Sequence, residues 1–308
     1  MTKFIPKRSL FDIQVNGFAG VDFQDPRLSA RQLRRACIAL RRHRTGKILL
    51  TLITDSVAAL DRQFARICAM RSADPVLKDV IAGFHLEGPY ISPEDGYRGA
   101  HPREFVKAPD LREFDRLQRA ACGLIRLVTI APEWPGSARF ISGLAERGVV
   151  VGLGHTDATE GEIDRAIAAG ASLCTHLGNG CPAILHRHDN IIQRLLARDE
   201  LVACFIPDGI HLPPAVLKNL IRAKPAGRVI LTTDAMAAAG AGPGTYRIGK
   251  VRVRCGRDGI VRMPGAPTFA GSSLTLERGV ENAARWCGVP RDTTWACASS
   301  VPAKIFSP

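Results

Sequence analysis

The chain has 308 residues, of which 46% are hydrophobic and 23% charged, with a formal net charge of +13. This composition is normal for a soluble globular protein, and no apolar run approaches the roughly 20 residues needed to cross a bilayer. Nine scattered cysteines without a Cys-x-x-Cys pair argue against a disulfide framework or a zinc ribbon and favour a reducing cytoplasm. The N-terminus has no apolar segment of the kind that signals secretion, so no signal peptide is expected.

The positive charge is the one unusual feature of the composition. A strongly basic protein can bind nucleic acid, an anionic membrane surface or an anionic substrate. No aromatic residues interleave with the basic ones, and no nucleic-acid-binding motif occurs. We therefore expect solvated basic helix faces, no nucleic-acid or membrane partner, and a surface that steers an anionic substrate. The densest group is Arg31, Arg34, Arg35, Arg41, Arg42 and Arg44.

Strand and helix patterns alternate along the whole chain. The predicted strands are apolar runs rich in Val, Ile and Leu, typical of strands buried on both faces, at 11–16, 47–54, 80–87, 125–131, 149–155, 172–176, 201–207 and 228–234. Helical patterns lie at 29–43, 57–71, 110–120, 136–147, 160–170, 189–198, 213–223, 272–287 and 290–305. Eight strands, each followed by a helix, predict one α/β domain over 1–308, a (β/α)₈ TIM barrel whose chemistry lies at the C-terminal ends of the strands.

Residues 245–265 interrupt this alternation. Apolar and basic residues alternate there around a Gly-Arg-Asp-Gly turn at 256–259. This pattern predicts a β-hairpin, which we place as an insertion after the eighth strand.

Four predicted strands end in residues that can bind a metal or move a proton. A single strand-end histidine is usually structural, but Glu87, His155 and His176 close three strands that meet at one barrel mouth. Together they form the ligand set of a catalytic divalent metal with an open coordination position. This set suits zinc, and iron or cobalt also fit. His85 shares the strand face of Glu87 and is a supporting or alternative ligand.

Asp234 closes the predicted strand at 228–234 and lies beside the expected metal. A carboxylate there is a candidate general base for an attacking water. The alternative is a residue that caps the helix beginning at Ala235. We favour the base because the apolar strand before Asp234 aims its side chain into the barrel mouth.

Six motifs occur in an order that resembles the N-acetylglucosamine-6-phosphate deacetylase family of the amidohydrolase superfamily, from about Phe11 to the C-terminus. They are His85-Leu-Glu-Gly-Pro89, Gly154-His155-Thr156, Thr175-His176-Leu177-Gly-Asn179, Asp208-Gly-Ile-His211, Thr233-Asp234-Ala235-Met236 and Ala270-Gly271-Ser272-Ser273-Leu274-Thr275. The resemblance implies Glu87, His155 and His176 as metal ligands and Asp234 as the catalytic acid and base.

The resemblance also implies how the substrate is held. His101 would contact the acetyl carbonyl, although the sequence alone favours an ordinary loop histidine. Asn179 and Gly180 would bind the sugar phosphate through backbone amides, Arg187 would grip the phosphate, and Asp208 would orient an imidazole such as that of His211. The residues implied to surround the substrate are Ala100, His101, Asn179, Gly180, Arg187, His211, Phe269, Ala270 and Gly271.

Three features depart from the family pattern. Gln14-Val15-Asn16 occupies the place of a His-x-His pair, and amides are poor ligands for transition metals, so one metal is expected. The alternative for Gln14 and Asn16 is hydrogen bonding across the barrel mouth. Gly180 replaces an alanine, and the segments that usually form a small β-sandwich are largely absent. The uncovered face and the family's shared pocket lead us to expect a homodimer.

The expected reaction is removal of the acetyl group from N-acetylglucosamine 6-phosphate, giving glucosamine 6-phosphate and acetate, in the cytoplasm. One alternative is a deacetylase for another N-acetyl amino sugar, such as the galactosamine isomer. The other is a non-catalytic barrel that binds a sugar phosphate.

Overall fold

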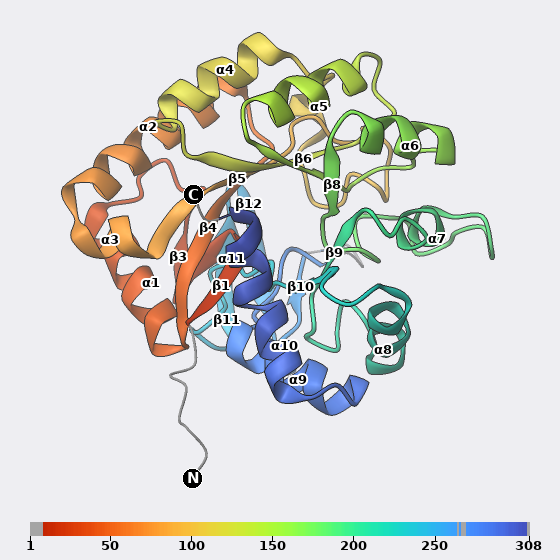
Figure 1. Ribbon diagram of the computed structural model, residues 1–308. Helices are drawn as coiled ribbons and strands as arrows, with labels where there is room; N and C mark the ends of the chain where they lie inside the picture. The colour runs from red at the N-terminus through yellow and green to blue at the C-terminus, as the bar shows by residue number, and fades with distance from the viewer. Residues whose placement is uncertain (1–8, 264, 266–268, 307–308) are drawn as a thin grey trace.

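The computed structural model, which describes residues 9–263, 265 and 269–306, contains eight parallel strands arranged as a barrel (Figure 1). In spatial order they are β1 (Leu10–Val15), β4 (Thr45–Ile53), β5 (Ile81–Glu87), β6 (Ile125–Ile130), β7 (Val150–Leu153), β8 (Ala171–Cys174), β9 (Val202–Phe205) and β10 (Val229–Leu231). A parallel bridge between Val15 and Ala235 brings the last strand back to the first, so the barrel is nearly closed. The predicted TIM barrel is confirmed.

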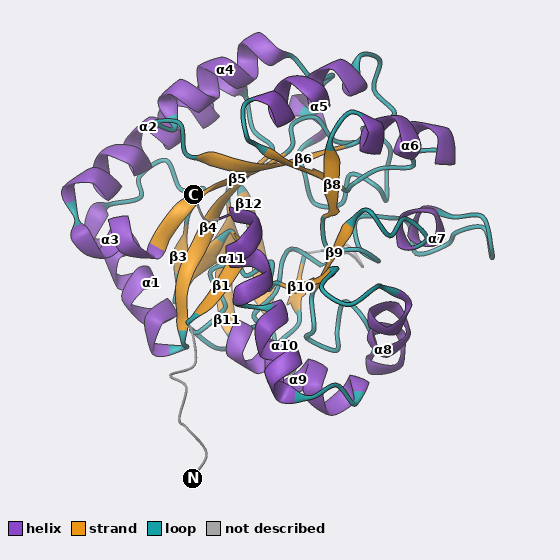
Figure 2. Ribbon diagram, viewed as in Figure 1, coloured by secondary structure: helices purple, strands orange, loops and turns teal. Residues whose placement is uncertain are grey.

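Helices surround this barrel (Figure 2). They are α1 (Ala30–Arg42), α2 (Val57–Ala73), α3 (Pro75–Val80), α4 (Leu111–Ala120), α5 (Ser137–Glu146), α6 (Glu160–Ala168), α7 (Ile191–Leu196), α8 (Pro214–Ala223), α9 (Leu276–Cys287), α10 (Arg291–Cys297), α11 (Ser300–Phe306) and the 3₁₀ turn η1 (Arg103–Phe105). The sequence predicted one helix over 290–305, but the structure divides it into α10 and α11. No described helix is both long and apolar enough to cross a membrane.

The end of the barrel opposite the strand C-termini is sealed by α11. Inward-facing strand residues form a buried cluster with Phe306 of α11, and the rings of Phe11 and Phe306 meet edge to face at 6.2 Å. Figure 1 shows α11 in front of the barrel strands. Among the described residues, this end of the barrel is therefore filled by side chains, and the other end is where the strand C-termini lie.

The insertion after β10 contains more than the predicted hairpin. β11 (Gly244–Ile248) and β12 (Val251–Cys255) pair antiparallel, and β13 (Val261–Arg262) adds a third strand beside β12. The predicted turn at 256–259 therefore connects β12 to β13, and the hairpin itself turns at 249–250. A short antiparallel pair, β2 (Gly17–Phe18) with β3 (Val21–Asp22), was not predicted. Residues 1–8, which bear on the signal-peptide expectation, and residue 264 of the predicted insertion lie outside the described residues.

Candidate active site

Three of the four chemically important residues lie just beyond their strands in a left-handed backbone conformation. The φ angles are 53° at His155, 28° at His176 and 50° at Asp234. Non-glycine residues rarely adopt positive φ, and such a conformation costs of order 1–3 kcal/mol. The sequence predicted that these residues are the last of their strands. The predicted strand ends were wrong by two or three residues: β7, β8 and β10 end earlier, because a left-handed residue cannot continue a β-ladder.

A set of buried hydrogen bonds fixes the backbone around Asp234. The Thr233 hydroxyl donates to Asp12 Oδ2 at 2.6 Å and accepts from the Ala235 amide at 3.0 Å. The Ser272 hydroxyl donates to the Thr233 carbonyl at 2.6 Å, and the Ser272 amide donates to the Asp234 carbonyl at 2.8 Å. These contacts lie on both sides of Asp234 and hold its strained backbone in one position.

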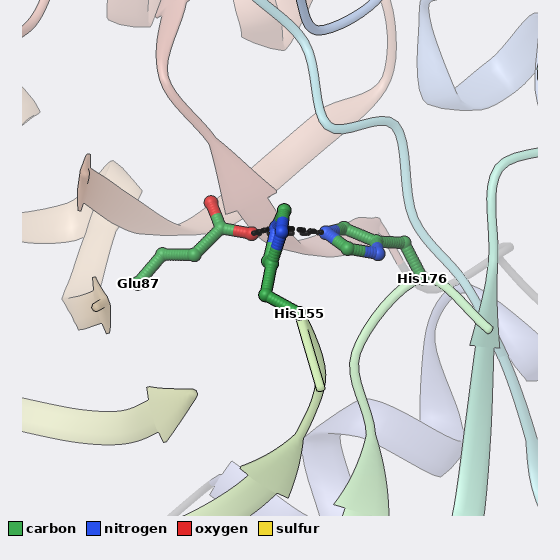
Figure 3. Close-up of side chains that lie close together, drawn as sticks. All are labelled: Glu87, His155 and His176. Carbon is green, nitrogen blue, oxygen red and sulfur yellow. Dashed lines mark hydrogen bonds and ion pairs between the residues drawn. The ribbon is translucent and has the colours of Figure 1, made fainter. Parts of the chain in front are cut away.

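The three predicted metal ligands meet at the barrel mouth (Figure 3). Glu87 Oε1 lies 3.0 Å from His176 Nε2 and 3.3 Å from His155 Nε2, and the two Nε2 atoms are 3.1 Å apart. All three side chains are buried. Burial opposes ionisation of Glu87, but its close contacts with the imidazoles of His155 and His176 outweigh burial and hold the pKa of Glu87 well below its usual value.

This geometry fits a small divalent cation. His155 Nδ1 lies 2.8 Å from the Tyr97 carbonyl, to which only an N–H can donate, so the neutral ring directs its Nε2 lone pair into the cluster. Two imidazole nitrogens and a carboxylate oxygen crowded together need a positive charge between them. Ligands bound to zinc at about 2.0–2.2 Å stand roughly 3.3 Å apart in a tetrahedral arrangement, which matches the observed separations.

Gln14 and Asn16 form the hydrogen bonds across the barrel mouth that the sequence offered as their alternative role. Gln14 Nε2 donates to Glu87 Oε1 at 2.9 Å and to Asp234 Oδ1 at 3.1 Å. Asn16 Nδ2 donates to the same oxygen of Asp234 at 2.6 Å. Burial raises the pKa of Asp234 to about 8, and the nearby Glu87 carboxylate adds to the rise. A cation held by the cluster would oppose this rise.

Two further buried histidines flank the cluster. His101 Nδ1 lies 2.8 Å from the Thr54 hydroxyl, and the rings of His101 and His155 meet edge to face at 4.6 Å. Burial lowers the pKa of His101 to about 3, so its imidazole is neutral. His85 lies between Thr129 and Thr51, at 2.8 Å and 3.3 Å, and does not belong to the ligand group.

A cavity of about 1550 Å³ opens over these groups. The cavity wall includes twelve of the thirteen predicted site residues, namely Glu87, Ala100, His101, His155, His176, Asn179, Gly180, His211, Asp234, Phe269, Ala270 and Gly271. Arg187 is the exception. It is exposed on the loop between β8 and α7 and does not line the cavity formed by the described residues.

Two hydrogen bonds involve the residues predicted to hold the sugar phosphate, and only the first of them was expected. His211 Nδ1 lies 2.6 Å from Asp208 Oδ2, so Asp208 orients this ring as predicted. The Asn179 amide donates to the His176 carbonyl at 3.0 Å. Because the Asn179 amide already has this partner, the Gly180 amide is the better candidate for binding an anion.

Gly180 is closely fitted to the metal cluster. Its φ is +62°, and a Cβ atom at this position would come within 2.9 Å of His155 Nδ1. A side chain there would strain the backbone and press on a ligand. The replacement of alanine by glycine thus suits the local geometry of this chain.

Several supporting residues were missed by sequence reasoning. The Tyr97 carbonyl orients His155, Thr54 holds His101, and Asp12 anchors the segment before Asp234. Thr54 follows β4 directly and Asp12 lies within β1. A polar residue inside an apolar strand is the signal that could have identified Asp12.

Known proteins resemble the chain over most of its length. It is 33% identical to an N-acetylglucosamine-6-phosphate deacetylase of Bacillus subtilis, over 89% of this chain and 68% of that protein. The chain belongs to the N-acetylglucosamine-6-phosphate deacetylase family. An N-acetylgalactosamine-6-phosphate deacetylase of Escherichia coli O157:H7 is 31% identical over 96% of this chain and 76% of its own length. No protein-family model matches the chain.

A solved structure supports the same assignment. The N-acetyl-D-glucosamine-6-phosphate deacetylase of Mycobacterium smegmatis, a mutant in complex with N-acetyl-D-glucosamine-6-phosphate, superposes with a TM-score of 0.88 at 32% identity. The superposition covers 97% of this chain and 77% of that one. The chain therefore has the same barrel fold as this member of the family.

Proposed function

We propose that this protein removes the acetyl group from N-acetylglucosamine 6-phosphate, yielding glucosamine 6-phosphate and acetate. The observation that carries the proposal is the buried group of Glu87, His155 and His176 with the Asp234 carboxylate in the same cavity. A barrel that only binds sugar phosphate has no need for a ligand set and a proton acceptor together.

The ligand group would hold one divalent cation, for which zinc is the best match to two imidazoles and a carboxylate. When bound, such a cation polarises the acetyl carbonyl and lowers the pKa of a water molecule. The water then loses a proton more readily and becomes a stronger nucleophile towards the carbonyl carbon. Among the described residues a second cation has no comparable ligands, because Gln14 and Asn16 present amides that are already bonded to Glu87 and Asp234.

Asp234 is the proposed proton carrier. Gln14 and Asn16 both donate to its Oδ1, so Oδ2 is the oxygen left to accept the proton of the attacking water. The same oxygen then returns that proton to the nitrogen of the leaving amino sugar, and the carboxylate is regenerated. The hydrogen bonds of Thr233 and Ser272 fix the backbone at Asp234, so that its carboxylate stays beside the amide bond that is cleaved.

His101 is the proposed donor to the acetyl oxygen. We assign the Thr54 hydroxyl, 2.8 Å from Nδ1, as the donor of this hydrogen bond, which would place the ring proton of the neutral imidazole on Nε2. An N–H aimed at the carbonyl oxygen stabilises the negative charge that develops there during attack.

The sugar phosphate is assigned to the Gly180 amide and to His211 as oriented by Asp208. Arg187 completes this site from a second subunit, since it is exposed and does not line its own cavity. The protein is accordingly a homodimer, and we place it in the cytoplasm on the grounds of its unpaired cysteines.

Acetate release from zinc-loaded protein tests the function. The panel is N-acetylglucosamine and N-acetylgalactosamine, each with and without 6-phosphate. Highest kcat/KM on N-acetylglucosamine 6-phosphate is the expected result. Preference for the galactosamine isomer would reassign the substrate, and binding of the sugar phosphates without acetate release would show that the barrel is not an enzyme.

A further inference from the structure

The cavity is larger than the proposed substrate requires. Small-molecule sites typically enclose about 300–1,000 Å³, whereas this one has about 1550 Å³. Its wall continues away from the metal ligands along residues 20–28 and 52–63 to the β11–β12 pair. The outer part of the cavity is therefore left unexplained by a monosaccharide phosphate.

The β11–β13 sheet covers this outer part and is strongly amphipathic. One face packs Ile248, Val253, Cys255 and Val261 against Met236 and Ala270 of the barrel mouth. The other face is exposed and carries Arg247, Arg252, Arg254 and Arg262. In Figure 1 β11 and β12 lie behind the barrel strands, away from α11.

Like charges face each other across these strands. Arg247 is directly opposite Arg252, and Arg254 is directly opposite Arg262. Such cross-strand pairs are destabilising without a counter-charge. Asp258 pairs with Arg262 at 2.7 Å, but within residues 244–262 no acid forms an ion pair with Arg247, Arg252 or Arg254.

Two acids of the cavity wall, Asp22 and Asp55, contact the β11–β12 turn, and Asp22 is also within electrostatic reach of Arg247. Asp22 Oδ2 accepts from the Gly249 amide at 2.8 Å, and Asp55 lies 3.8 Å from Lys250. These contacts anchor the β11–β12 turn to the barrel mouth. Arg247 and Arg252 both line the cavity, while Arg254 and Arg262 do not. Arg247 and Arg252 therefore lie at the exposed rim of the active-site cavity.

We propose that Arg247 and Arg252 form a second anion-binding subsite in the outer cavity, for a second anionic group on the amino-sugar phosphate substrate. This rests on the proposed deacetylase function and narrows its substrate class. Two arginines at directly opposite positions of paired strands can together bind the oxygens of a phosphate or a carboxylate. A bound anion would also relieve the repulsion between them.

Kinetics with paired substrates test the subsite. N-acetylglucosamine 1,6-bisphosphate carries an added phosphate and N-acetylmuramic acid 6-phosphate an added carboxylate, and each is compared with N-acetylglucosamine 6-phosphate. We expect wild type to favour one of the doubly anionic sugars by roughly tenfold in kcat/KM, as a charge-assisted contact to exposed arginines allows. The favoured sugar identifies the anion.

The double variant Arg247→Gln/Arg252→Gln should abolish that preference. The matched control is Arg254→Gln/Arg257→Gln, which removes the same charge from β12 and the turn after it, outside the cavity wall, and should retain the preference. Absence of a preference in wild type, or equal losses in the two double variants, would overturn the subsite.

A binding measurement separates this proposal from the deacetylase function. Glucose 1,6-bisphosphate and glucose 6-phosphate lack the acetamide, so their calorimetric Kd values do not depend on turnover. If no sugar releases acetate, the deacetylase assignment fails. The same Kd comparison is made for N-acetylmuramic acid 6-phosphate against N-acetylglucosamine 6-phosphate. The subsite still stands if either doubly anionic sugar binds about tenfold more tightly and only the Arg247/Arg252 variant loses that advantage, and it falls if the Kd values are equal in both comparisons.

Discussion

Replacing Asp234 by asparagine tests the proposed chemistry most directly. Both hydrogen bonds that reach Asp234, from Gln14 at 3.1 Å and from Asn16 at 2.6 Å, end on Oδ1. An asparagine can retain both with its own Oδ1 while its amide group takes the place of Oδ2. The backbone contacts from Thr233 and Ser272 do not involve the side chain. The substitution therefore removes the proton acceptor and leaves the surrounding network in place.

The expected loss follows from the role assigned to this carboxylate. General acid–base assistance contributes about 10²–10⁴-fold to rate, which corresponds to roughly 2.7–5.5 kcal/mol of activation free energy. Asp234→Asn should reduce kcat by this factor. KM should change little, because Asp234 is assigned to the reacting bond and not to the sugar phosphate.

The assay is steady-state acetate release, with metal content and thermal unfolding measured on the same preparations. Asp258→Asn provides a matched control, because it makes the same chemical change at an exposed residue of the insertion. A kcat within a factor of a few of wild type would refute Asp234 as the base. Loss of metal or a large fall in Tm would show that the side chain is structural instead.

The remaining predictions concern the metal, the phosphate and the assembly. Elemental analysis should find one divalent metal per chain, because Gln14 and Asn16 supply amides where a second site needs imidazoles; two metals per chain would contradict this. Arg187→Ala should lower kcat/KM about ten- to a hundredfold on the phosphorylated sugar and far less on the unphosphorylated one, and equal losses on both would show that Arg187 does not contact phosphate. Light scattering should show a homodimer, with the 178–190 and 208–215 loops near the interface, and a monomer with undiminished turnover would rule out a shared pocket.

The barrel and the metal ligands could be predicted because both follow from a regular pattern. Parallel strands buried on both faces read as continuous apolar runs, and their C-terminal ends meet at one mouth. Once the ends of β5, β7 and β8 are located, Glu87, His155 and His176 must approach one another. An error of two residues in a strand boundary does not move a side chain to the opposite end of the barrel.

Features set by contacts between distant segments could not be predicted. The division between α10 and α11 lets Phe306 reach the barrel interior and contact Phe11, which no local pattern requires. β13 contributes two residues whose pairing depends on β12. The position of Arg187 outside the cavity depends on the path of a long loop without regular alternation of residue types.

The left-handed residues connect the fold to the proposed chemistry. Three of the residues assigned to the proposed reaction, His155, His176 and Asp234, each adopt a backbone conformation that is unfavourable for a non-glycine residue. An extended strand would turn successive side chains to opposite faces, whereas a left-handed residue redirects the side chain as the strand ends. The hydrogen bonds from Asp12, Thr233 and Ser272 then hold that redirected geometry at Asp234. Strain at the strand ends is consistent with a site held rigidly in advance of substrate, since a carboxylate free to rotate would lose its alignment with the attacking water.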